Sequence, residues 1–317
     1  MSDDSQNTSQ RAAFIFPGQG SQSIGMLSDY SETAEVRETF QRASDVLDYD
    51  LWDLCQNGTD EQLAQTEKAQ PALLTASVAL WRVWQTKSAL PKLVAGHSLG
   101  EYSALVCAGI LDFEQAVSLV EKRGLFMQQA VPVGVGKMAA IIGLDGDKVK
   151  QACELSEQNE VVSPVNYNSP EQVVIAGNTK AVDRAMDACK ENGAKRVMPL
   201  TVSVPSHCML MKPAADQLED ILKSIKLNSS DISVVNNVDV SIETDQDKIK
   251  SALVRQLYSP VRWTECIHFI ATQGVDQLIE CGPGKVLSGL NRRIDRSLTS
   301  YQTHQLASLN QSVEALS

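Results

Sequence analysis

A serine on a glycine-rich turn is the side chain in this sequence best placed to act as a nucleophile. The run GHSLG at 96–100 matches the G-x-S-x-G pattern, with an apolar run at 93–95 before it and a helical run at 102–108 after it. This order of strand, turn and helix exposes the Ser98 hydroxyl at the end of a strand. The N–H of Leu99 and the start of the helix would face an oxyanion formed there. A chance turn with a helix-capping serine is the alternative.

His207 is the candidate base for Ser98, because a serine hydroxyl is a weak nucleophile without a base within hydrogen-bond reach. It ends the run VPSH at 204–207, in a loop from which an imidazole can reach a cleft. A histidine that simply lies on a surface loop is the alternative. His97 is a poorer candidate base because adjacent residues of the turn point apart. His268 lies in an amphipathic segment, where packing or exposure explains it.

Arg123 lies on the apolar face of a helix predicted at 113–129. That face is defined by four residues at helical spacing from it, Ala116, Leu119, Val120 and Met127. A guanidinium on a buried face needs an anionic partner, because an unpaired buried charge is very costly. The partner is either an internal Asp or Glu or an anionic ligand.

Composition excludes several classes of function. The 317 residues are 43% hydrophobic and 21% charged, so the chain can bury a sizeable core. With 28 Lys and Arg against 39 Asp and Glu, the net charge of −11 has the wrong sign for a nucleic-acid binder. No run approaches the roughly 20 apolar residues that span a bilayer. Residues 1–10 lack a secretory pattern, so we expect a cytoplasmic protein without membrane contact.

Cysteine and histidine usage argues against a metal site. The seven cysteines include no C-x-x-C pair, and the four histidines include no H-x-x-x-H pair. We therefore expect reduced, mostly buried thiols, no structural zinc and no cofactor.

The elements that must position these residues repeat the order strand, glycine turn, helix. The pattern predicts a buried strand at 12–16 before PGQG at 17–20, and a strand at 277–280 before GPG at 282–284 and a helix at 285–294. Further elements are predicted as a helix from 71 to 84, a helix at 213–225 and a strand at 232–236. The repetition predicts a parallel sheet of the α/β class.

The middle of the chain has a different order of elements. Strands are predicted at 137–144, 161–167, 172–176 and 196–200, with helices at 147–157 and 180–191. This is the β-α-β-β-α-β order of a ferredoxin-like unit, so we expect residues 134–200 to form an inserted subdomain. The rest is predicted to be a disordered leader at 1–11, a catalytic domain from 12–133 and 201–307, and a flexible tail at 308–317.

Six runs of the sequence, taken together, resemble those of bacterial malonyl-CoA:acyl carrier protein transacylases. In chain order they are FPGQG at 16–20, GHSLGE at 96–101, EKRG at 121–124, VNYNSP at 165–170, VPSH at 204–207 and GPG at 282–284. The resemblance spans residues 12–306. It implies an α/β fold with a hydrolase-like parallel-sheet domain and a ferredoxin-like lid. It also implies malonyl-CoA and holo-acyl carrier protein as substrates, without a cofactor.

The resemblance further implies a ping-pong transfer of malonyl groups for fatty-acid synthesis. Ser98 would carry the malonyl group as an ester, with His207 as the base. The oxyanion hole would come from the backbone N–H groups of Gln19 and Leu99. The main-chain carbonyl of Gln256 would orient the histidine in place of an acid.

Substrate recognition is implied in the same way. Arg123 would pair with the malonyl carboxylate, and Asn166, Gln256 and His97 would line the acyl site. Ser206 precedes the histidine, where malonyl-selective domains of large synthases often carry Phe, but stand-alone bacterial enzymes commonly have this Ser-His pair. An acidic carrier protein needs a local basic patch on this acidic chain, for which the candidates are Lys195, Arg196, Arg292, Arg293 and Arg296.

Two alternatives stay open. One is a serine acyl hydrolase or thioesterase with the same turn, which releases the acyl group to water. The other is a carrier-binding module without catalysis, against which the intact set of Ser98, His207 and Gln19 argues.

Overall fold

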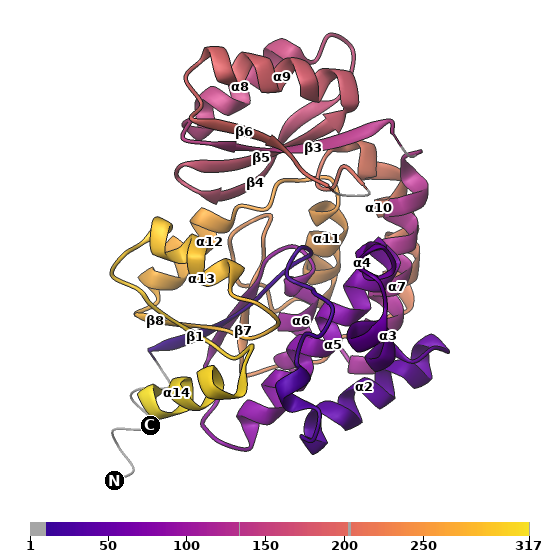
Figure 1. The fold of residues 1–317 in the computed structure, drawn as a ribbon, viewed down its shortest axis with the longest axis vertical. Helices are drawn as coiled ribbons and strands as arrows, with labels where there is room; N and C mark the ends of the chain where they lie inside the picture. Colours follow the sequence, from indigo (N-terminus) through magenta and orange to yellow (C-terminus); the bar gives the residue numbers. More distant parts are fainter. Residues whose placement is uncertain (1–10, 133, 202–203, 317) are drawn as a thin grey trace.

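The strands of the protein form two separate sheets in the computed structural model, which describes residues 11–132, 134–201 and 204–316 (Figure 1). The larger sheet has the order β7-β2-β1-β8-β9, and all its neighbouring strands are parallel. Its strands are β1 (Ala12–Phe16), β2 (Leu93–Gly96), β7 (Ser233–Val235), β8 (Gln277–Glu280) and β9 (Thr299–Gln302). The predicted parallel sheet is confirmed.

The helices of the large part include the crossover connections that parallel strands need. They are α2 (Ala34–Leu47), α3 (Leu51–Asn57), α4 (Asp60–Ala64), α5 (Thr66–Gln85), α6 (Gly100–Cys107), α7 (Phe113–Ala130), α10 (Lys212–Ser224), α11 (Gln246–Gln256), α12 (Trp263–Thr272), α13 (Val286–Ile294) and α14 (Leu306–Leu316). Two 3-10 helices are η1 (Ser28–Tyr30) and η2 (Met209–Met211). None of the helices in the described ranges is long and apolar enough to cross a membrane.

The smaller sheet is antiparallel and has the order β4-β5-β3-β6. Its elements are β3 (Gly136–Ile142), α8 (Gly146–Ser156), β4 (Val162–Ser169), β5 (Gln172–Asn178), α9 (Thr179–Glu191) and β6 (Arg196–Pro199). Helices α8 and α9 pack on one face of this sheet through an apolar cluster. The predicted ferredoxin-like order is confirmed; that residues 134–200 form a subdomain of their own stays a prediction.

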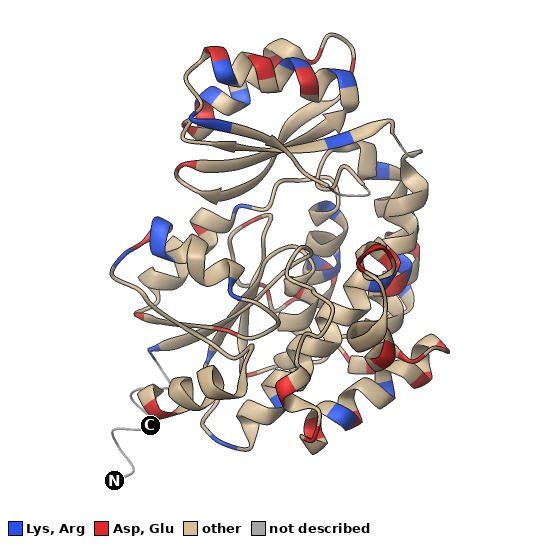
Figure 2. Ribbon diagram, in the orientation of Figure 1, with Lys and Arg blue, Asp and Glu red and all other residues tan. Residues whose placement is uncertain are grey.

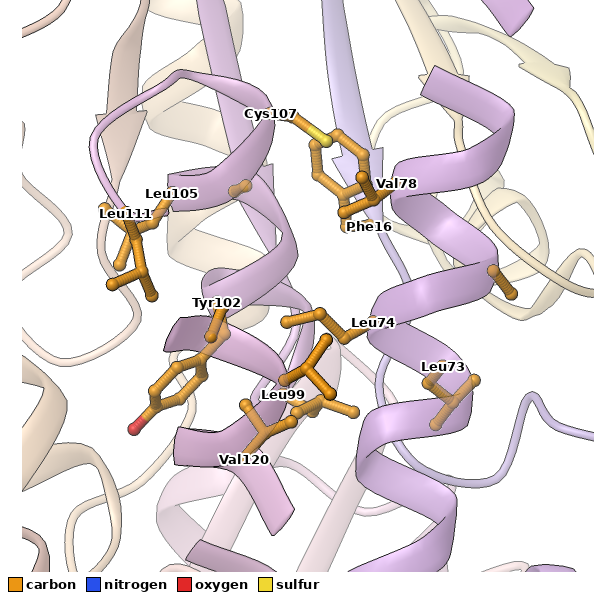
Figure 3. Close-up of a cluster of buried hydrophobic side chains, with 14 of the residues drawn as sticks. Phe16, Leu73, Leu74, Val78, Leu99, Tyr102, Leu105, Cys107, Leu111 and Val120 are labelled. Carbon is orange, nitrogen blue, oxygen red and sulfur yellow. The ribbon is translucent and has the colours of Figure 1, made fainter. Parts of the chain in front are cut away.

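Both faces of the large sheet are covered, and alternate residues of its central strand β1 show how. Phe14 and Phe16 belong to the cluster that includes α5, α6 and α7, whereas Ala13 and Ile15 pack with α12 and α13. In Figure 3, Leu74 of α5 lies beside Leu99, which directly precedes α6, within the first of these clusters. Because side chains of a strand alternate between its faces, a strand buried on both sides is continuously apolar.

The two sheets are joined beside β4. Val261 donates its N–H to the Val165 carbonyl and accepts from the Tyr167 N–H, both at 2.9 Å. The hydroxyl of Thr264 on α12 donates to the Tyr167 carbonyl at 3.0 Å. Residue 166 lies between Val165 and Tyr167, so these contacts hold it against the large part.

Several predicted boundaries differ from the structure. The helix predicted from 71 begins at Thr66, so Pro71 lies within α5 instead of at its start. The flexible tail predicted at 308–317 is wrong for its described residues, because α14 occupies Leu306–Leu316 and buries Leu309 and Leu316. Residues 1–10 of the predicted leader and residue 133 at the predicted domain boundary lie outside the described residues.

Candidate active site

Ser98 lies on the turn that joins β2 to α6, as the sequence predicts. Its backbone is in the left-handed region with φ of 52°, a strained conformation for a residue with a side chain. A Cβ on Gly96 would lie 1.8 Å from the Gly100 carbonyl carbon, so the turn can form only with glycine there. The Asn237 side chain fixes the turn from β7: its Oδ1 accepts from the Ser98 N–H and its Nδ2 donates to the Gly96 carbonyl, each at 2.7 Å.

The structure brings His207 to Ser98. The distance from Ser98 Oγ to His207 Nε2 is 2.7 Å, and His207 Nδ1 lies 2.6 Å from the Gln256 carbonyl oxygen. A carbonyl can only accept, so Nδ1 carries the proton and Nε2 is free to accept from the serine hydroxyl. Burial, and then the charge of Arg123, lower the pKa of His207 to about 3. The histidine is therefore a neutral base, and the predicted contact with Gln256 is present.

Arg123 is buried, with 1% of its surface exposed, and its partners are amides. It donates to Gln70 Oε1 at 2.9 Å and to Gln256 Oε1 at 3.1 Å. None of the ion pairs within the described ranges includes it. The carboxylate that acts on its charge, Glu101, is linked to it through Gln256 and does not contact it directly. A guanidinium has five N–H donors. Donors not used by the two amides are available to an anion.

Close packing of α7 on α5 places Arg123 beside Gln70. A Cβ on Gly124 would lie 2.7 Å from the backbone of Glu67, so a side chain at 124 would push the two helices apart. The ring of Tyr102 lies 5.3 Å from the guanidinium carbon of Arg123 and adds a cation–π contact. Burial lowers the pKa of Arg123, which stays far above neutrality because a guanidinium is effectively always protonated.

These groups open onto one cavity of about 730 Å³. The large part contributes the sequence-predicted residues Gln19, His97, Ser98, Leu99, Arg123 and His207 to its lining, and the small sheet contributes Met138, Asn166, Asn168 and Val174. The size fits a small-molecule site. Among the described residues no group of three or more His, Cys, Asp or Glu side chains could hold a metal ion.

The predicted oxyanion donors lie on adjacent turns. Leu99 directly precedes α6 and is buried, whereas Gln19 is on the exposed turn after β1. A Cβ on Gly18 would lie 2.5 Å from the His97 carbonyl oxygen, which shows how closely the two turns approach. Their joint role as an oxyanion hole stays a prediction.

His97 and Asn166 lie in the cavity wall, away from the Ser98 hydroxyl contact. The His97 Nε2 is 2.8 Å from Asn168 Oδ1, and its ring packs against Trp263 at 5.5 Å between centroids. Burial lowers the pKa of His97. Asn166 is 7% exposed and lies on β4 next to the seam with Val261.

The predicted docking residues gather where the small sheet meets α13. Arg196 on β6 and Gln172 on β5 both lie opposite Ile142 of β3, and Arg293 donates to Gln172 Oε1 at 3.0 Å. Lys195 pairs with Glu171 at 3.6 Å. Arg292 and Arg296 are exposed at the same end of α13. Figure 2 shows this basic end of α13 far from the acidic helices α2 to α4.

Sequence reasoning missed three amide side chains of the site: Gln70, Asn168 and Asn237. Gln70 precedes Pro71, which hid the first turn of α5. Asn168 belongs to the run VNYNSP, so it could have been predicted as a site residue together with Asn166. Asn237 follows a strand, but nothing local signals that its side chain reaches Ser98, 139 residues away in the chain.

A serine and a neutral histidine at the carboxyl end of a parallel sheet, with a buried arginine in the same cavity, define a class of serine enzymes that handle acyl groups. The family model for the acyl transferase domain matches residues 13–309, and the chain belongs to this family.

Close relatives carry one name. The malonyl CoA-acyl carrier protein transacylase of Salmonella typhimurium is 60% identical over 94% of this chain and 97% of the relative. The Bacillus subtilis protein of the same name is 44% identical over 96% and 97%.

Solved structures agree with these relatives. An acyl carrier protein S-malonyltransferase from Vibrio cholerae superposes with a TM-score of 0.93 at 60% identity, over 95% of this chain and 99% of that one. A malonyl-transacylase solved in complex with its type II polyketide acyl carrier protein gives a TM-score of 0.95 at 58% identity, over 96% and 99%.

Proposed function

We propose that this enzyme transfers a malonyl group from malonyl-CoA to the phosphopantetheine thiol of holo-acyl carrier protein, through a malonyl ester on Ser98. One observation carries the assignment of roles. The Ser98–His207 pair opens onto the same cavity as Arg123, a buried cation that donates to two neutral amides and belongs to none of the ion pairs in the described ranges. A nucleophile and an anion receptor in one cavity fit an acyl group that carries its own carboxylate.

In the first half of the reaction Ser98 attacks the thioester carbonyl. The hydroxyl proton passes to His207 Nε2 as the new C–O bond forms. The N–H groups of Gln19 and Leu99 stabilise the oxyanion. When the tetrahedral intermediate collapses, the C–S bond breaks and the coenzyme A thiolate leaves with the proton from His207.

The second half runs in reverse with a different thiol. His207 takes the proton of the phosphopantetheine thiol, the thiolate attacks the ester carbonyl, and Ser98 leaves and regains the proton. The Gln256 carbonyl stabilises the imidazolium that forms in each half. No net proton is lost, so one histidine serves both half-reactions.

Arg123 selects the acyl group by binding the malonyl carboxylate, with Asn166 and His97 in the cavity wall beside it. Gln70 and Gln256 hold the guanidinium from one side, so it does not have to be ordered when substrate arrives. Preordering of the arginine lets the charge-assisted bonds contribute to binding and orientation of the substrate.

Intact-mass measurement tests the reaction directly. We expect malonyl-CoA to add one malonyl group to the wild-type protein and holo-acyl carrier protein to remove it, with malonyl-carrier as the product. Ser98→Ala is expected to acquire no adduct and to keep its fold, because the hydroxyl contributes little packing. Free malonate in place of malonyl-carrier would instead identify a hydrolase. A malonyl ester on the Ser98→Ala protein would contradict the assignment.

We also propose a cytoplasmic location and a role in supplying fatty-acid synthesis. All seven cysteines are buried and free, which suits a compartment that keeps thiols reduced. Loading rates with a fatty-acid carrier and a polyketide carrier, measured side by side, test which pathway the enzyme supplies.

A further inference from the structure

Glu101 is a buried carboxylate that the proposed reaction does not use. It lies in the first turn of α6, three residues after Ser98, and is 3% exposed. Its Oε2 accepts two hydrogen bonds, from the Asn237 N–H at 2.9 Å and from Gln256 Nε2 at 2.8 Å. Burying a carboxylate is costly, so its presence here calls for a function.

Both residues that Glu101 binds hold the reacting groups. Asn237 fixes the Ser98 turn through the Ser98 N–H and the Gly96 carbonyl. Gln256 contacts three groups: its Nε2 donates to the Ser98 carbonyl at 3.0 Å, its Oε1 accepts from Arg123, and its main-chain carbonyl accepts from His207. A single hydrogen bond therefore links Glu101 to each of two residues, Asn237 and Gln256. These two residues hold the proposed nucleophile, base and anion receptor.

The chemistry of the carboxylate also decides which way the Gln256 amide faces. An ionised carboxylate can only accept hydrogen bonds, and a guanidinium can only donate them. With Glu101 on one side and Arg123 on the other, the amide must place its NH2 toward Glu101 and its oxygen toward Arg123. The flipped amide would place two donors face to face at Arg123 and two acceptors face to face at Glu101.

We infer that Glu101 is a positioning residue of the transfer reaction, which sets the Ser98 turn through Asn237 and orients Arg123 through Gln256 without touching the substrate. Only one part of the inference rests on the proposed function, namely the orientation of Arg123 toward the malonyl carboxylate. Its effect on Ser98 can be measured with a reagent that needs no malonyl group.

Burial opposes the charge of Glu101, whereas its two donors and Arg123 favour it. Burial raises the pKa of Glu101 to about 7, against the two donors and the charge of Arg123, which lower it. Asp239, on the loop after β7, adds a smaller opposing charge. The net result is a raised pKa, so the ionised form predominates only above about pH 7. The geometry at Oε2, which accepts from both donors, is what places Glu101 as an acceptor.

Two substitutions at position 101 separate positioning from bulk stability. Glu101→Ala removes the acceptor, whereas Glu101→Gln keeps one oxygen, and both native donors bind the same oxygen, Oε2. The matched control is Tyr30→Phe, which removes a buried 2.6 Å bond to the Thr303 carbonyl, away from the cavity lining. All are compared with wild type for Tm, for the rate at which a fluorophosphonate labels Ser98, and for kcat/KM with malonyl-CoA and acetyl-CoA.

We expect Glu101→Ala to slow labelling about tenfold or more and to lower the malonyl-to-acetyl preference, because two held groups lose their anchor. Glu101→Gln should recover labelling to within a few-fold of wild type. Tyr30→Phe should lower Tm and leave labelling unchanged. If the alanine variant does not fold, Glu101→Asp replaces it, because its shorter side chain withdraws the acceptor by one methylene and should slow labelling in the same direction.

Two results would overturn the inference: a folded Glu101→Ala or Glu101→Asp protein that labels at the wild-type rate, or a Glu101→Gln protein that labels no faster than the alanine or aspartate variant. Failure of the proposed function looks different. In that case wild-type protein transfers no malonyl group, whereas the labelling rates still report on the positioning of Ser98.

Discussion

The two parts of the molecule contribute unequally to the cavity. The groups proposed to react, Ser98 and His207, and the proposed carboxylate-binding Arg123 all belong to the large part, where each is tied to another element by a hydrogen bond. Ser98 and His207 are even held with positive φ, at 52° and 64°. The small sheet contributes side chains that stand on regular strands, such as Met138 and Val174.

This difference separates chemistry from fit. Strained backbone persists only where surrounding contacts over-determine it, and the large part supplies such contacts through long-range amides. The small sheet closes the cavity and touches the large part at the Val261 seam and through the pair of Asn168 with His97. We therefore expect changes at Ser98 and His207 to alter the reaction rate itself and a change at Arg123 to alter selectivity strongly, whereas changes in the small sheet should alter substrate fit to a smaller extent.

The largest expected effect is that of Arg123→Ala on malonyl transfer. Hydrogen bonds to charged groups contribute about 1.5–3 kcal/mol each, so losing a bidentate pair should lower kcat/KM for malonyl-CoA by roughly a hundredfold or more. Acetyl-CoA has no carboxylate, and its kcat/KM should stay level or rise. The measurement is the ratio of the two kcat/KM values in wild type and variant. An equal fall for both substrates would make Arg123 a structural residue.

Local sequence patterns placed Ser98 on its turn and Arg123 on a buried helix face, because each pattern carries its own structural context. The turn around Ser98 needs only its flanking strand and helix, and the inward phase of Arg123 follows from the spacing of its own helix. The tail shows the opposite error. Its polar composition hid the apolar residues Leu309, Val313 and Leu316, whose helical spacing predicts the helix that the structure contains.

The amides that support the site could not be predicted in this way. Gln70 and Asn237 become functional only when helices and strands far apart in the sequence pack together. An amide has no preferred local structure or charge that would mark it. The same holds for Glu101, whose two partners lie more than a hundred residues away.

The pH dependence of Ser98 labelling tests the electrostatics of the large part. With neutral His207 as the proposed base, protonation of His207 should lower the rate as pH drops through the pKa of this histidine. Burial and the Arg123 charge lower that pKa to about 3, so labelling by a fluorophosphonate should keep its rate from about pH 8 to about pH 4, instead of falling near the usual histidine value of about 6.5.

Arg123→Ala should raise the pKa of His207, because a repelling charge is removed. The loss of labelling rate at low pH should then move to higher pH. Gln70→Leu is the control, since it removes a partner of Arg123 and keeps the charge; its profile should follow wild type. Circular dichroism at each pH verifies that the fold is intact. Glu101, whose pKa burial raises to about 7, is removed as a source of such a change by repeating the profile on Glu101→Gln. A loss centred near pH 6.5 that persists in Glu101→Gln, or a shift to lower pH in the Arg123→Ala variant, would contradict this account.

A smaller effect is expected on the side of the small sheet. Asn168→Ala removes one hydrogen bond to His97, so malonyl loading should slow by up to about tenfold, while fluorophosphonate labelling of Ser98 stays at the wild-type rate. Thr264→Val is the control, because it removes a seam bond outside the cavity lining and should leave loading unchanged. If labelling slows as much as loading in Asn168→Ala, the division between chemistry and fit fails.

The smallest effect is expected where the two parts meet at the surface, in the docking of the carrier protein. Helices α2 to α4 carry Glu35, Glu38, Asp45, Asp53, Asp60 and Glu61, which would repel an acidic carrier (Figure 2). Arg196 and Gln172 lie on opposite sides of Ile142 in the small sheet, and Arg293 donates to Gln172, so the two arginines are at the same end of that sheet. Reversing both arginines to Glu should raise KM for the carrier several-fold, and less at high salt.

The KM for malonyl-CoA should not change, because neither of the two arginines lines the cavity. The same change in charge made by Arg37→Glu with Lys148→Glu, on exposed faces of α2 and α8, is the matched control. Since this control alters the net charge equally, a rise in carrier KM confined to the Arg196 and Arg293 pair would assign the effect to their position. Equal rises in the carrier KM of both double variants would mean that the carrier responds only to the net charge of the enzyme. Arg196 and Arg293 would then have no special role in docking.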